Sequence, residues 1–114
     1  MVKSNINNYL PYGKHYISNE DIEEVMSVLK SKNLTQGEYI PRFEKEISNK
    51  VNAKYSVAVN SATSALHLAC LALDVTKGDY VWTSPISFVA SANCALYCGA
   101  KVDFVDIDPF SGLI

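Results

Sequence analysis

The sequence lacks the long apolar run that a membrane-spanning helix requires. No stretch approaches the roughly eighteen uninterrupted apolar residues needed to cross a bilayer. The start of the chain, Met1 to Asn8, is polar and has no apolar core of a secretion signal. We therefore expect a protein that neither inserts into a membrane nor is secreted, and the cytoplasm is the expected location.

The sequence also has no cluster of positive charge. Ten Lys and Arg residues face twelve Asp and Glu residues, the net charge is −2, and Arg42 is the single arginine. Surfaces that bind nucleic acid or anionic lipid carry clustered Lys and Arg. Nucleic acid and membrane partners are therefore not expected.

Cysteine is scarce and has no metal-binding spacing. The three cysteines, Cys70, Cys94 and Cys98, form no CxxC motif, and their odd number excludes a fully paired disulfide framework. Cys94 and Cys98 are four residues apart in a predicted helix, and we interpret these two as small buried side chains in a reducing compartment. No metal site is predicted.

The 48% of hydrophobic residues is typical of a globular chain and too high for a disordered one. Residues 1–17 are predicted to form an N-terminal arm, and residues 18–52 two amphipathic helices.

Ser18 and Asp21 form a capping box that starts the first helix. The two helices show helical spacing of apolar residues that predicts one buried stripe on each: Ile22, Val25, Met26 and Leu29, then Phe43, Ile47 and Val51 after Pro41, with Asn52 as terminator.

Residues 53–114 show short apolar runs that alternate with helical stretches. Strands are predicted at 55–59, 80–83 and 101–105. One helix is predicted to follow the segment 60–63 and to end at Leu73. A second helix is predicted over 88–97, with Ser87 as its cap and Gly99 as its left-handed stop. This βαβαβ order predicts a parallel α/β fold, part of a three-layer α/β/α domain. A parallel sheet needs helices on both faces and normally more strands, so we expect the chain to be part of a larger domain.

Ligands of open parallel sheets bind beyond the carboxyl ends of the strands. The segment 60–64 (NSATS) follows the first predicted strand and begins a helix, where backbone N–H groups favour a phosphate. An ordinary Ser/Thr helix cap explains the same residues. The segment 83–90 follows the second predicted strand and carries Phe88, which fits either a core position or a plate against a planar ring. The first turn has no G-x-G-x-x-G dinucleotide motif.

Three ordered motifs, 32–37 (KNLTQG), 60–66 (NSATSAL) and 83–93 (TSPISFVASAN), resemble the DegT/DnrJ/StrS family of sugar aminotransferases that depend on pyridoxal 5′-phosphate (PLP). The resemblance covers Tyr12 to Pro109, the amino-terminal part of a much longer fold type I enzyme. It is strongest to the branch that aminates a 4-keto sugar nucleotide in pseudaminic acid synthesis. It implies a PLP cofactor, a sugar nucleotide substrate, glutamate as amino donor and a homodimer.

The resemblance also assigns residues to ligands. It implies that Ser61, Ala62 and Thr63 bind the cofactor phosphate and that Phe88 stacks on the pyridine ring. It implies that the sugar nucleotide contacts a set of residues near the start of the chain: Tyr12, Lys32, Thr35, Gln36 and Gly37.

No catalytic residue is predicted. Transamination needs a Schiff-base lysine and a carboxylate against the pyridine nitrogen, and none of the nine lysines (3, 14, 30, 32, 45, 50, 54, 77 and 101) lies in the family's lysine motif. His15 is expected in an exposed loop, His67 in a core, and Asp106 and Asp108 in a turn. We therefore predict the amino-terminal part of an aminotransferase that is inactive alone. The alternative is a noncatalytic α/β module that binds phosphate or nucleotide, or self-associates.

Overall fold

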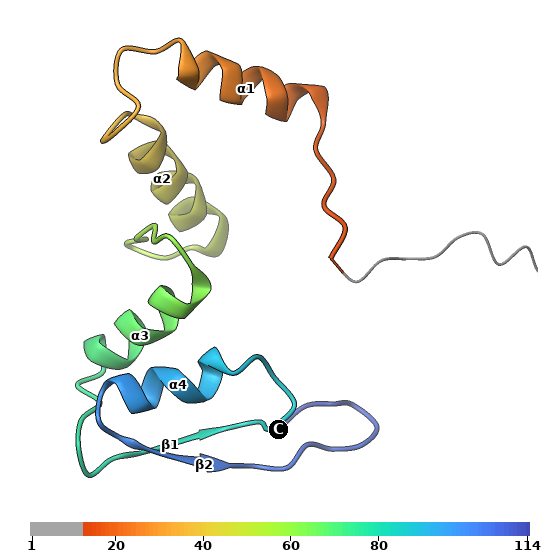
Figure 1. Cartoon of the computed structure of the whole chain (residues 1–114), viewed down its shortest axis with the longest axis vertical. Helices are drawn as coiled ribbons and strands as arrows, with labels where there is room; N and C mark the ends of the chain where they lie inside the picture. Colours follow the sequence, from red (N-terminus) through yellow and green to blue (C-terminus); the bar gives the residue numbers. More distant parts are fainter. Residues whose placement is uncertain (1–12) are drawn as a thin grey trace, which may run out of the picture.

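The computed structural model describes residues 13–114, which form four helices and two strands. Figure 1 shows how these elements are arranged. The tyrosine of the predicted substrate set, Tyr12, and most of the predicted arm lie outside the described residues. The elements follow the order α1 (Asn19–Leu29), α2 (Tyr39–Val51), α3 (Ala62–Ala72), β1 (Tyr80–Thr83), α4 (Ala90–Tyr97) and β2 (Lys101–Phe104).

The ends of α1 and α2 follow local sequence signals. The Ser18 side chain accepts a hydrogen bond from the Asp21 backbone at 3.3 Å, and the Ser18 N–H donates to the Asp21 carboxylate at 2.8 Å. This confirms the predicted capping box, a feature that stabilises a helix by about 1 kcal/mol. Asn52 ends α2 in the left-handed conformation, with φ of 53°, as predicted. Helix α2 starts at Tyr39, so Pro41 lies in its first turn.

The predicted burial of the apolar stripes on α1 and α2 is wrong for this chain. Their apolar side chains remain 37–65% exposed: Ile22, Val25, Met26, Leu29, Phe43, Ile47 and Val51. The two helices lie along an open arc (Figure 1), and the radius of gyration is 20.0 Å. A compact domain of this length would have a radius of about 13 Å. The stripes therefore have the predicted spacing but no described surface covers them.

The two strands form a parallel pair in register from Tyr80 opposite Lys101 to Thr83 opposite Phe104. This confirms a parallel α/β arrangement with α4 as the connection. The first predicted strand, 55–59, does not form. A strand requires a neighbouring strand for its backbone groups; here the N–H of Ala58 donates instead to the Glu44 carboxylate of α2, at 2.8 Å.

The best-packed region lies between α4, the strands and α3. Helix α4 packs on both strands, α3 packs on α4, and the two helices run in the same direction (Figure 1). The fully buried side chains of this core are small: Ala90, Cys94, Ala95 and Ala100. His67 of α3 contacts Tyr97 of α4 edge to face, with ring centres 5.3 Å apart, as a packing histidine would.

The cysteines also meet in this region. Cys94 is buried, whereas Cys70 and Cys98 are half-buried, so the predicted burial is confirmed for Cys94 and wrong for Cys98. Burial, together with the neighbouring Cys94 and Cys98 thiols, raises the pKa of the Cys70 thiol to about 11. All three cysteines are free thiols.

Two predicted features of α4 have different outcomes. Ser87 does not cap the helix, which starts at Ala90 rather than at Phe88; the Ser87 hydroxyl lies 3.2 Å from that of Ser91. Val89 already has helical dihedral angles, so the chain enters α4 without a side-chain cap. Gly99 follows the helix with φ of +77°, which confirms the predicted left-handed stop.

Among the helices of residues 13–114, none combines the length and the apolar character that a bilayer crossing demands.

Candidate functional site

The turn at the start of α3 is organised by its own side chains. Ser61 is the N-cap, with extended backbone, and its hydroxyl accepts a hydrogen bond from the Ser64 N–H at 3.1 Å. The Ser64 hydroxyl donates to the Asn60 side-chain oxygen at 2.8 Å and lies 3.1 Å from the Ser61 hydroxyl. These contacts fix the turn and already engage both serine hydroxyls.

The next two residues of this turn offer hydrogen-bond donors. Within the described residues, the backbone N–H groups of Ala62 and Thr63 donate to no acceptor, and the Thr63 hydroxyl has no partner. The first N–H groups of any helix lack partners inside the helix, and the helix dipole adds partial positive charge there. The donor set therefore fits a phosphate group, such as that of PLP.

Phe88 lies between β1 and α4, and its side chain is 74% exposed. It lines a cavity of about 190 Å³ together with residues that follow β1 and the last residue of β2: Ser84, Pro85, Ser87, Val89, Ser91, Ala92 and Phe104. The cavity therefore lies at the carboxyl ends of the strands, where ligands of parallel sheets bind. None of residues 61–64 lines it, although α3 and α4 begin at the same end of the helix pair (Figure 1).

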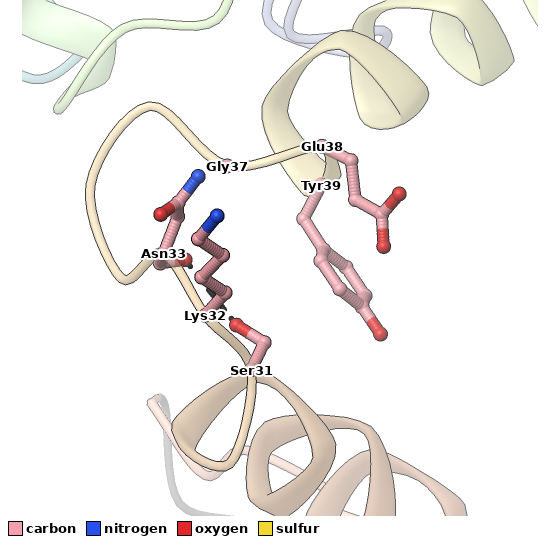
Figure 2. Close-up of a pocket in the computed structure, with 6 residues that line it drawn as sticks. All are labelled: Ser31, Lys32, Asn33, Gly37, Glu38 and Tyr39. Atoms are coloured by element: carbon pink, nitrogen blue, oxygen red, sulfur yellow. Dashed lines mark hydrogen bonds between the residues drawn. The ribbon is translucent and has the colours of Figure 1, made fainter.

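A second pocket, of about 200 Å³, is formed by the loop between α1 and α2. Of the predicted substrate residues, Lys32 and Gly37 line it and Thr35 and Gln36 do not. The other lining residues, shown in Figure 2, are Ser31, Asn33, Glu38 and Tyr39. None of these four was predicted to bind the substrate; for Tyr39, its position directly after a glycine-containing loop was the available signal.

Lys32 supplies positive charge to this pocket. Its side chain extends into the space between the loop and Tyr39 (Figure 2). The ammonium group has no ion pair or hydrogen bond with any described residue. An unpaired ammonium group attracts phosphate oxygens as a point charge.

The loop that carries Lys32 makes a close turn. Gln36 is left-handed, with φ of 53°, and a Cβ atom added to Gly37 would lie 3.0 Å from the Asn33 carbonyl oxygen. The Ser31 hydroxyl donates to that same oxygen at 3.3 Å. Glycine at position 37 therefore permits the close approach that shapes the pocket.

The remaining candidate groups serve structural roles. The Asp108 carboxylate accepts hydrogen bonds from the Ser111 and Phe110 N–H groups at 2.7 and 3.1 Å, which lowers its pKa. Asp106 accepts from the Ile107 N–H, and His15 is exposed. No cluster of potential metal ligands occurs in residues 13–114.

Comparison with known proteins relates the chain to sugar aminotransferases. The sequence pattern of the DegT/DnrJ/EryC1/StrS aminotransferase family matches residues 15–114. The chain is 42% identical over 98 residues to the UDP-4-amino-4,6-dideoxy-N-acetyl-beta-L-altrosamine transaminase of Campylobacter jejuni, a match that covers 86% of this chain and 26% of that protein.

Solved structures give the same result. PseC of Helicobacter pylori, an aminotransferase involved in the biosynthesis of pseudoaminic acid, superposes with a TM-score of 0.80 and 36% identity, over 86% of this chain and 27% of PseC. Spr1654 of Streptococcus pneumoniae in its PLP form superposes with a TM-score of 0.82 and 30% identity, over 90% of this chain and 26% of that one. The chain thus spans about a quarter of the length of these relatives.

Proposed function

Because the chain belongs to the DegT/DnrJ/EryC1/StrS aminotransferase family, we propose that it carries the cofactor-phosphate turn and part of the substrate pocket of a PLP-dependent sugar-nucleotide aminotransferase. The similarity of the parallel α/β fold to solved sugar aminotransferases supports this proposal, and we assign the chain to the large domain of such an enzyme. The observation that carries the proposal is the pair of unpartnered N–H groups at the start of α3, on Ala62 and Thr63. The whole enzyme would transfer an amino group from glutamate to a UDP-linked 4-keto sugar.

Ala62 and Thr63 hold the cofactor phosphate through their backbone N–H groups, and the Thr63 hydroxyl adds a third donor. Ser61 contributes by fixing the turn, since its hydroxyl caps the helix. Phe88 places its exposed ring against the pyridine ring. When bound, the cofactor supplies the carbonyl chemistry that receives and releases the amino group.

Lys32 and Gly37, in the loop before α2, bind the sugar nucleotide. The proposed phosphate turn follows α2 in the sequence. The Lys32 ammonium group attracts the diphosphate. Gly37 allows the backbone to approach the Asn33 carbonyl oxygen closely, which shapes the pocket. Thr35, Gln36 and Tyr12 complete the predicted contacts. The choice of a UDP-linked substrate is supported by the name of the Campylobacter jejuni relative.

Self-association and a cytoplasmic location belong to the same proposal. The outer edges of β1 and β2 carry backbone groups without a strand partner among the described residues, and apolar side chains of α1 and α2 are exposed. Unpaired edges and apolar faces favour contacts between chains. Gel filtration at two concentrations tests this directly; a monomer at both contradicts it.

The cofactor assignment is tested with pyridoxamine 5′-phosphate, whose amine does not condense with surface lysines. We expect it to shift the backbone amide NMR signals of Ala62 and Thr63, whereas pyridoxamine without phosphate does not. Thr63→Val removes one donor and should weaken binding about fivefold, or ~1 kcal/mol. Thr76→Val, in the loop after α3, is the matched control.

Two results would overturn this assignment. Equal binding of pyridoxamine with and without phosphate removes the role of the helix start. Signal shifts caused by UDP alone, with none caused by the phosphorylated vitamer, favour the noncatalytic nucleotide-binding module instead.

A further inference from the structure

Tyr39 is the first residue of α2, and its hydroxyl group forms hydrogen bonds with side chains of α1. The phenol oxygen is 3.0 Å from a carboxylate oxygen of Glu24 and 2.9 Å from the Ser27 hydroxyl. A carboxylate only accepts, so the phenol proton goes to Glu24 and the Ser27 hydroxyl donates to the phenol oxygen. Glu24 and Ser27 are three residues apart and therefore lie on one face of α1.

This tyrosine provides the hydrogen bonds that join α1 to α2. Both side-chain hydrogen bonds between the two helices, as the structure describes them, end on the Tyr39 hydroxyl. No Cα atom of α1 lies within 8 Å of a Cα atom of α2. The angle between the helices therefore depends on a side chain rather than on packed backbones.

The contacts of the Tyr39 ring fix its position further. The guanidinium carbon of Arg42, one turn along α2, lies 5.8 Å from the ring centre, within the range of a cation–π contact. The ring also lines the pocket that contains Lys32, across the opening from that side chain (Figure 2). The same ring thus contacts the helix junction and the pocket.

We propose that Tyr39 is a positioning residue: its hydroxyl fixes α2 against α1 and so holds the loop 30–38 in the conformation that presents Lys32 to an anionic ligand. The loop is attached to α1 at one end and to α2 at the other, so a change in the helix angle moves its two ends relative to each other. The choice of a nucleoside diphosphate as that ligand rests on the proposed function, whereas the positioning of the loop does not.

The proposal is tested first by amide hydrogen exchange on the whole chain. We expect Tyr39→Phe, which keeps the ring and removes the hydroxyl, to speed exchange in residues 31–38 by at least about threefold. Exchange within α3 should stay unchanged, because the effect is local. Tyr55→Phe is the matched control, since the Tyr55 side chain is also exposed and its hydroxyl has no hydrogen bond among the described residues.

Variants at Glu24 separate positioning from general destabilisation. Glu24→Gln keeps an oxygen acceptor for the phenol proton, so it should retain most of the protection in residues 31–38. Glu24→Ala removes the acceptor and should behave like Tyr39→Phe. Unprotected loop amides in the parent chain, or equal effects of Gln and Ala at position 24, would overturn the proposal.

The second readout is the affinity for UDP, measured by calorimetry. We expect Tyr39→Phe to weaken UDP binding about threefold while leaving pyridoxamine 5′-phosphate binding at α3 unchanged. If UDP fails to bind the parent chain, the substrate assignment fails, and the exchange result still decides the role of Tyr39. Faster loop exchange with unchanged UDP affinity would show that the hydroxyl does not control the pocket.

Discussion

The Glu44 carboxylate of α2 accepts a hydrogen bond from the backbone N–H of Ala58 at 2.8 Å. Ala58 is fourteen residues further along the chain than Glu44. The contact therefore joins α2 to the segment that leads into the turn at Ser61. It takes the place of the strand partner that the sequence pattern of 55–59 predicts. The Glu44 side chain therefore helps to hold the segment that leads to the turn at Ser61.

Glu44→Ala should lower the free energy of unfolding by about 1–2 kcal/mol, because it leaves a partly buried N–H group without an acceptor. Glu44→Gln keeps an acceptor and should cost less. Urea denaturation measures both. Glu46→Ala is the control, because Glu46 lies on a different face of the same helix and is exposed. Equal losses at positions 44 and 46 would contradict the role of the hydrogen bond.

Gly37→Ala should disturb the loop between α1 and α2. The added Cβ atom would lie 3.0 Å from the Asn33 carbonyl oxygen, so the backbone must shift. Overpacking of this kind costs about 1 kcal/mol or more. Thermal unfolding and UDP titration should both report the change. Gly13→Ala, with no atom within 4 Å of the added Cβ, should be neutral; a neutral Gly37→Ala would disprove the close turn.

Cys70 should react slowly with alkylating agents. Its pKa is raised to about 11 from an ordinary value of 9.0, so the unreactive thiol form persists at pH 9 and the thiolate appears only as the pH approaches 11. Below pH 9 the thiolate fraction is about 100-fold smaller than for an ordinary cysteine. Mass spectrometry after iodoacetamide treatment at several pH values measures the rate; fast labelling of Cys70 at pH 8 would refute the shift.

The purified 114-residue chain should show no transaminase turnover with glutamate and a UDP-linked keto sugar. Lys101, for example, begins β2 and lies 3.2 Å from the Tyr80 hydroxyl, at the end of the sheet opposite to the Phe88 cavity. An assay coupled to 2-oxoglutarate formation checks this expectation. Turnover above that of the chain-free control would refute the absence of a catalytic lysine.

Features that depend on neighbouring residues were predictable from sequence. The capping box at Ser18, the helix end at Asn52, the left-handed Gly99 and the strand 80–83 occur as expected, because each is determined within a few residues. The parallel arrangement followed from the alternation of elements. The prediction that Ser87 caps α4 is wrong, because the Ser87 hydroxyl lies against the Ser91 hydroxyl and not against a backbone N–H group.

Features that depend on distant partners were not predictable. The apolar stripe of α1 has helical spacing, but spacing does not supply a surface to cover Val25 or Leu29. The run 55–59 has strand composition, but hydrogen bonding to a second strand decides whether a strand forms. Tyr39 was missed for the same reason, since its partners Glu24 and Ser27 lie on another helix. The assignments of Ala62, Thr63 and Phe88 remain predictions.

Packing α3 and α4 in the same direction has an electrostatic consequence. Two helices that run alike bring their like-signed ends together, so the positive ends repel each other in water and more strongly at low ionic strength. A dianion bound between the two positive helix ends would be attracted by both of them and would offset their mutual repulsion. If the proposed cofactor phosphate binds at this end of the pair, the arrangement predicts tighter binding of a dianion than of a singly charged anion.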